Sequence, residues 1–116
     1  MAEREKAIVD GLDRPDLVGG VLEAAKGLWF GSGELDWEWL VTYSLRLEDP
    51  AAARRLGFWL ELLNLADERL LSRLEVGRGH SYARLEPSGP EQGPRNGRWR
   101  LIINIPEHQL LEWREH

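Results

Sequence analysis

The chain has no cysteine, so it can form neither disulfides nor thiolate metal sites, a pattern typical of proteins in a reducing compartment. No apolar run approaches the roughly 20 residues of a membrane-spanning helix, and the acidic N-terminal stretch has none of the features of a signal peptide. An excess of positive charge is also missing, because 15 basic against 20 acidic residues give a net charge of −5. These absences predict a cytoplasmic protein that binds neither membranes nor, non-specifically, DNA.

What is present is the composition of an ordinary globular domain. The 116 residues are 42% hydrophobic, 30% charged and 9% aromatic, which predicts a single domain over residues 1–116 with a core of its own. The charge is uneven. Residues 1–50 carry 5 basic and 11 acidic side chains, whereas residues 69–100 carry 7 Arg against 3 Glu. We therefore expect a modest basic region on an acidic body.

Apolar residues recur at helical spacing through the first two-thirds of the chain. They predict five helices, over about residues 3–12, 15–29, 36–47, 50–63 and 67–74, with Gly19–Gly20 inside the second. Asp36, Asp49 and Asp67 are expected to cap or begin the last three. The helix after Asp36 is apolar around most of its girth and is expected to lie centrally, while Gly57 indicates a close crossing of two helices.

The apolar period changes from 3.6 to 2 after Gly79. Ser81–Leu85 and Arg98–Ile105 are predicted strands, and a proline- and glycine-rich connection of residues 86–97 joins them. Trp99, Leu101, Ile103 and Ile105 share the face expected to be buried. The predicted fold class is α+β, mainly helical with about five helices, and a C-terminal antiparallel β-hairpin packed on the helices. A last short helix is expected after Pro106.

The sequence contains partial matches to catalytic and cofactor-binding motifs, but none of these motifs is complete. His80, His108 and His116 lack the spacing of a metal site. Gly31–Ser32–Gly33 is not extended to a nucleotide-binding fingerprint, and the Ser in residues 79–83 follows a predicted helix instead of a strand, the reverse of a nucleophile elbow. We therefore predict a protein that is not an enzyme and that uses no cofactor and no metal.

Arginines are the candidate residues for contact with a partner or with nucleic acid, because guanidinium groups bind phosphate and stack on aromatic rings. The fourth predicted helix carries two of them on its outer face, and the others lie on or beside the hairpin. The full set is Arg54, Arg55, Arg78, Arg84, Arg95, Arg98 and Arg100. The alternative interpretation is a solvated turn whose arginines pair with Glu86 or Glu91. Of the tryptophans, Trp39, Trp59 and Trp99 fall on faces expected to be buried.

Several of these local features occur together in one known family. Arg4–Pro15, Gly19–Gly20 and Ala25–Trp29 resemble the start of the C-terminal domain of AbiEi-type antitoxins, the antitoxin and autorepressor proteins of type IV toxin–antitoxin (abortive infection) systems. Leu35–Tyr43 and Arg54–Phe58 resemble the next two helices of that domain. Its closing hairpin is similar to Leu85–Pro87, Gly93, Asn96 and Trp99–Asn104. The resemblance covers almost the whole chain in the order of the family.

The resemblance implies a non-catalytic regulatory domain that counteracts a nucleotidyltransferase-type toxin, usually encoded next door. We expect it to act through the arginine-bearing hairpin loop and the fourth helix. Family members usually carry a DNA-binding winged helix-turn-helix before the segment that matches Glu5–Asp10. We expect this chain to lack it, because Met1 lies so close to that segment.

Two alternatives stay open. The first is a nucleic-acid-binding transcriptional regulator that uses the basic residues Arg78, Arg84, Arg95, Arg98 and Arg100. The second is a structural or dimerising adaptor, for example a homodimer, with the tryptophan-rich helices three and four partly exposed. Salt-dependent binding of nucleic acid would distinguish the first, and exposed tryptophans the second.

Overall fold

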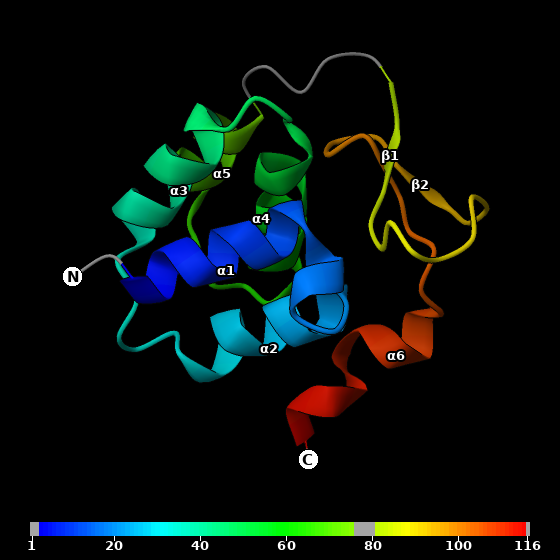
Figure 1. Cartoon of the computed structure of the whole chain (residues 1–116), viewed down its shortest axis with the longest axis horizontal. Helices are drawn as coiled ribbons and strands as arrows, with labels where there is room; N and C mark the ends of the chain where they lie inside the picture. The colour runs from blue at the N-terminus through cyan, green and yellow to red at the C-terminus, as the bar shows by residue number, and fades with distance from the viewer. Residues whose placement is uncertain (1–2, 76–80, 116) are drawn as a thin grey trace.

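The structure is a computed structural model that describes residues 3–75 and 81–115. Its elements are α1 (Glu3–Asp13), the 3-10 helix η1 (Pro15–Leu17), α2 (Val21–Phe30), α3 (Trp37–Arg46), α4 (Ala51–Leu62), α5 (Glu68–Leu74), β1 (Ala83–Arg84), β2 (Arg95–Asn96), β3 (Leu101–Ile102), α6 (Glu107–Leu111) and the 3-10 helix η2 (Glu112–Glu115). Figure 1 shows α1 to α5 gathered on one side, the strands on the other, and α6 leading back below them toward α2. The α+β, mainly helical class is confirmed. No helix in the described part of the chain combines the length and apolarity needed to cross a bilayer.

The central helix is α4. All residues from Ala51 to Leu60 are buried, and α4 packs against α1, α3 and α5. The expectation that α3 is central is wrong, since its buried residues are Leu40, Val41 and Ser44 and most of its other side chains are half-buried or exposed. Small residues explain the difference, because three alanines in the first turn of α4 let neighbouring elements approach it from several sides.

Local capping begins the helices where the sequence predicts. The Asp36 side chain accepts a hydrogen bond from the Trp39 amide (3.1 Å), and that of Asp67 accepts one from the Leu70 amide (3.1 Å). Asp49 accepts from the Ala51 amide (2.9 Å), so it too satisfies a free N–H at a helix start. The three predicted caps are therefore confirmed. They could be predicted because each depends on residues only two or three positions apart in the sequence.

The strands form a three-stranded sheet in the order β1-β3-β2, not the predicted two-stranded hairpin. β1 pairs parallel to β3, with Ala83 opposite Leu101, whereas β2 pairs antiparallel to β3, with Asn96 opposite Leu101. The antiparallel pairing of residues 81–85 with residues 98–105 is therefore wrong. The physical reason is that the expected connection supplies its own strand, β2, which occupies the antiparallel side of β3.

One tryptophan joins the sheet to the helices. Trp99 is fully buried, and its ring lies so close to Gly57 that a Cβ atom there would come within 2.2 Å of it. Its indole N–H donates to Glu61 (2.9 Å). Gly57 therefore marks a close approach, as the sequence indicates, but the approaching group is an aromatic ring and not a second helix.

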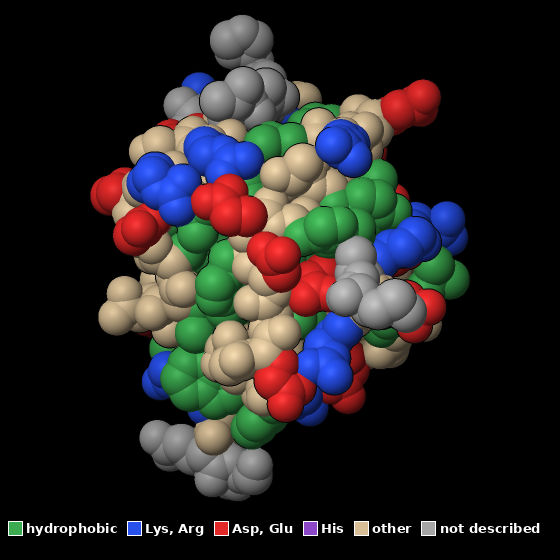
Figure 2. All heavy atoms as spheres, turned by 90° about the vertical axis from the view of Figure 1, so that its left-hand side faces the viewer, with side chains coloured by type: hydrophobic (Ala, Val, Ile, Leu, Met, Phe, Trp, Pro, Cys, Tyr) green, Lys and Arg blue, Asp and Glu red, His purple; other side chains and the backbone are tan. Residues whose placement is uncertain are grey.

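The remaining surface carries both signs of charge. Figure 2 shows the side that lies on the left in Figure 1. On this face acidic and basic side chains are intermingled, and hydrophobic side chains are exposed among them. Trp59, Trp99 and Trp113 are buried, while Trp29, Trp37 and Trp39 are half-buried. Trp39 is therefore less buried than expected. The most exposed large hydrophobic residues among those described are Leu17 (67%) and Phe30 (63%). Trp37 and Trp39 leave part of α3 exposed, as the adaptor hypothesis requires of that helix, whereas Trp59 of α4 is buried.

Candidate functional site

Arg54 and Arg55 lie inside the molecule, where each is 4% exposed. The Arg54 guanidinium donates to the carbonyl oxygen of Ser81 (3.0 Å). The Arg55 guanidinium donates to the carbonyl oxygens of Arg84 (3.0 and 3.2 Å) and Leu12 (2.8 Å). The outer-face prediction is wrong because the end of α1 and the segment leading into β1 cover this side of α4. Both arginines satisfy main-chain acceptors there.

Among the described residues, no carboxylate contacts the Arg55 guanidinium, whose hydrogen-bond partners are all main-chain carbonyl oxygens. Burial lowers the pKa of its guanidinium, and the nearby charges of Asp49, Asp13 and Glu86 act in the opposite direction. Burial also raises the pKa of Asp13, with a further contribution from repulsion by Asp49. The space between α4 and β1 therefore holds a buried positive centre whose compensating carboxylates stand at a distance.

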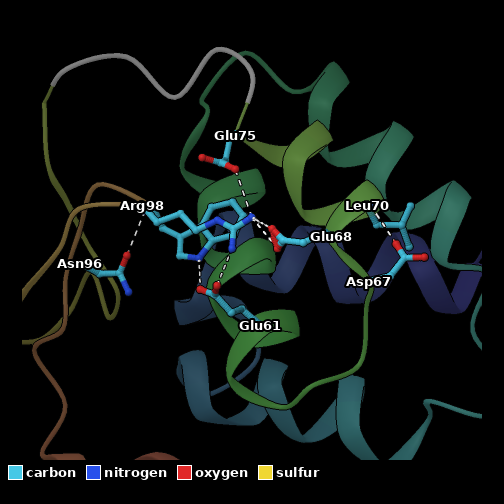
Figure 3. A network of polar contacts seen from close by, with 8 residues as sticks. Glu61, Asp67, Glu68, Leu70, Glu75, Asn96 and Arg98 are labelled. Carbon is cyan, nitrogen blue, oxygen red and sulfur yellow. Dashed lines mark hydrogen bonds and ion pairs between the residues drawn. The ribbon is translucent and has the colours of Figure 1, made fainter.

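Arg98 is held by three glutamates of the helical side (Figure 3). Its guanidinium pairs with Glu61 on α4 (2.5 Å), Glu68 on α5 (2.7 Å) and Glu75 just after α5 (3.1 Å). Hydrogen bonding to Glu68, followed by Glu61, raises the pKa of Arg98 above its usual range. Arg98 therefore fixes the turn of residues 97–100 to two helices, and little of its positive charge is directed to a partner.

Arg95 and Arg100 share an aromatic neighbour, and with Tyr82 they form what we call the Tyr82 cluster. Their guanidinium carbons lie 5.1 Å and 5.7 Å from the centroid of the Tyr82 ring, a cation–π distance. No carboxylate of the described residues lies within ion-pair distance of either arginine. Arg100 has a φ of 55°, and its buried Nε lacks a hydrogen-bond partner in the described structure. Backbone strain of this kind is commonest at functional sites.

Arg84 lies on β1 at the edge of the sheet, and its Nη1 donates to the carbonyl oxygen of Gly89 (2.8 Å). It therefore holds the loop that follows β1. Arg78, the remaining predicted contact residue, lies outside the described residues. The structure thus brings four of the seven predicted arginines together around β1: Arg55, Arg84, Arg95 and Arg100.

A pocket of about 450 Å³ opens between the start of α4, β1 and the following loop. Its walls are Asp49, Ala51, Arg55, Tyr82, Ala83, Arg84, Pro87, Glu91 and Ile102. Arg55 and Arg84 line this pocket directly. Tyr82 also lines it, and the ring of Tyr82 contacts Arg95 and Arg100, the two arginines of the Tyr82 cluster. Neither Tyr82 nor Asp49 is recognisable as a member of a site from the sequence, because only the parallel pairing of β1 with β3 places Tyr82 beside Arg100.

The residues that carry the family resemblance are connected in space. Glu86 accepts a hydrogen bond from the Val21 amide (2.9 Å) and so caps α2, while the Asn104 side chain binds both main-chain polar groups of Glu86 (2.9 and 2.8 Å). Gly20 has a φ of 118°, and a Cβ there would lie 2.8 Å from the Glu86 carboxylate. The pair Gly19–Gly20 therefore precedes α2, and its predicted place inside the helix is wrong.

Comparison with known proteins yields no relative: no family model, no curated protein and no solved structure matches the chain. Within the described ranges, no three side chains of the metal-binding types come together.

Proposed function

We propose that this chain is a non-catalytic, antitoxin-like regulatory domain of the cytoplasm that counteracts a nucleotidyltransferase-type toxin of a type IV toxin–antitoxin system. The observation that supports it is the mutual dependence of the residues that resemble the family. Glu86 and Asn104 join the sheet to α2, Trp99 packs on Gly57, and Arg55 joins α1, α4 and β1. Two of these contacts, Trp99 on Gly57 and Arg55 on Leu12, join segments of the resemblance that lie far apart in the sequence.

The surface through which we expect the domain to act is the exposed part of β2 and of the turn that leads to β3. Arg95 is exposed and Arg100 is half-buried, and no described carboxylate pairs with them. The contribution expected from the fourth helix is withdrawn, because Arg54 and Arg55 are buried. An unpaired guanidinium beside an aromatic ring is a common anchor in protein–protein contacts.

Co-expression tests this proposal. The full chain is produced together with the nucleotidyltransferase encoded nearest to its gene, and growth is followed. We expect the chain to relieve growth arrest and Arg95→Glu to relieve it less, since the change reverses an exposed charge of the proposed surface. Arg14→Glu is the matched control, because Arg14 is also exposed and its described partner is Asp16 within η1. Growth arrest that the soluble wild-type chain leaves unrelieved would overturn the proposal.

A further inference from the structure

The arginines around β1 differ from most others in the described structure. Arg4, Arg14, Arg69, Arg73 and Arg98 each pair with a carboxylate. Around the pocket, the described structure shows four guanidinium groups with no carboxylate in contact: Arg55, Arg84, Arg95 and Arg100. The pocket lining itself carries two arginines, Arg55 and Arg84, against two carboxylates, Asp49 and Glu91. The excess of positive charge comes from Arg95 and Arg100, which lie next to the pocket beside the Tyr82 ring. An excess of unpaired guanidinium at a concave site favours an anionic ligand.

The walls of the pocket also favour a ligand with a planar apolar part. The Tyr82 ring, Pro87 and Ile102 supply apolar surface, and the volume of about 450 Å³ lies within the range of small-molecule sites, roughly 300–1,000 Å³. The carboxylates of Asp49 and Glu91 are hydrogen-bond acceptors, which suits the hydroxyl groups of a sugar. Anion, ring and hydroxyl groups together describe a nucleotide.

We propose that this pocket binds a nucleoside di- or triphosphate, with its phosphates near Arg55 and Arg84 and its base against Tyr82. A single mononucleotide fits better than a nucleic-acid strand. Asp49 and Glu91 repel a second run of phosphates. Arg98, which a nucleic-acid strand lying along β2 and β3 would need, already pairs with three glutamates. The net charge of −5 opposes a long polyanion in the same way. This binding activity does not depend on the proposed antitoxin function.

Isothermal titration of the purified full chain with ATP, pyrophosphate and adenosine at low ionic strength tests the proposal. We expect ATP to bind with one-to-one stoichiometry, pyrophosphate to bind more weakly and adenosine most weakly. Arg84→Gln removes one charge-assisted contact and is expected to weaken ATP binding by about tenfold or more. Tyr82→Leu is expected to weaken the binding of ATP while leaving that of pyrophosphate unchanged, because only ATP carries a base.

Two further variants separate binding from folding. Arg95→Gln alters an exposed residue that contacts Tyr82, so a several-fold weaker affinity for ATP in a protein of unchanged melting temperature supports the site. Arg69→Gln is the control and is expected to bind ATP normally, because Arg69 lies on α5 and pairs with Glu38. Absence of saturable ATP binding to the wild-type chain, or equal affinity in wild type and Arg84→Gln, would overturn the proposal. So would tight binding of a single-stranded oligonucleotide that ATP does not displace. The titration contains no toxin. If the chain failed to relieve growth arrest in the co-expression assay, the proposed antitoxin function would fail while the measured affinity for ATP would stand.

Discussion

Replacing Gly57 by alanine tests the seat of the Trp99 ring on α4. The new Cβ atom would lie 2.2, 2.4 and 2.6 Å from three ring carbons, whereas real contacts of this kind lie beyond 3 Å. The ring has no room to retreat, since Trp99 is fully buried and its indole N–H is bound to Glu61. Overpacking of a core costs about 1–3 kcal/mol, and the helix propensity of alanine returns about 1 kcal/mol. The net loss in the free energy of unfolding of Gly57→Ala is therefore expected to be up to about 2 kcal/mol, because three contacts under 3 Å place the cost at the upper end of its range.

Gly27→Ala is the matched control, because Gly27 is also inside a helix and a Cβ there meets Ile8 at an ordinary 3.5 Å. This control is expected to be stabilised by about 0.5–1 kcal/mol through helix propensity. Urea unfolding of the two variants gives the comparison. The double variant Gly57→Ala with Trp99→Leu is expected to lose less than the sum of its single changes, because the smaller side chain removes the clash. If Gly57→Ala proved as stable as Gly27→Ala, the close seat of the ring on α4 would be refuted.

Three further changes test other contacts. Arg98→Gln leaves three glutamates facing one another and is expected to lower the free energy of unfolding by about 1 kcal/mol. Urea titrations at low and high salt should show a smaller loss at high salt, because salt screens the repulsion between the glutamates. A loss that does not depend on salt would contradict this cause. Glu86→Ala removes the cap of Val21 and is expected to cost about 1 kcal/mol in thermal unfolding, whereas Glu86→Gln keeps an acceptor oxygen and loses less; equal losses would argue against the cap. Asp13 has a pKa above its ordinary value in the folded protein, so folding favours its protonated form and stability falls as pH rises from its unfolded-state pKa through the folded one. Asp13→Asn should therefore be the more stable protein at pH 7 but not at a pH below both pKa values, and urea midpoints at the two pH values check the sign.

The part of the fold that follows from neighbouring residues is predictable from the sequence. Asp36 and Asp67 cap helices through contacts across three positions, and their residue types and places are sufficient to identify them. The pairing of strands is different, because β1 and β3 lie far apart in the chain and a two-residue strand carries almost no periodicity. Neither the parallel register nor the presence of β2 could be read from such short segments.

In the candidate site, too, the residue types can be predicted from the sequence, whereas their burial and their neighbours cannot. The arginines themselves are visible in the sequence, but the burial of Arg54 and Arg55 is not, since a charged side chain is expected on the surface unless the fold supplies its partners. They become buried because α4 is covered on more than one side, which is a property of the whole fold. Tyr82 enters the site for a similar reason, through the pairing of β1 with a strand that begins at Leu101.

The dependence of α4 on the sheet has a consequence for how the molecule comes apart. Without residues 81–104, two guanidinium groups would lose the carbonyls of Ser81 and Arg84, and a slot the width of an indole would open above Gly57. We therefore expect that the helices, which look like a separate body in Figure 1, do not fold autonomously. Amide hydrogens of α1 and β3 are expected to exchange with solvent through the same global opening, as in a protein with a single cooperative transition.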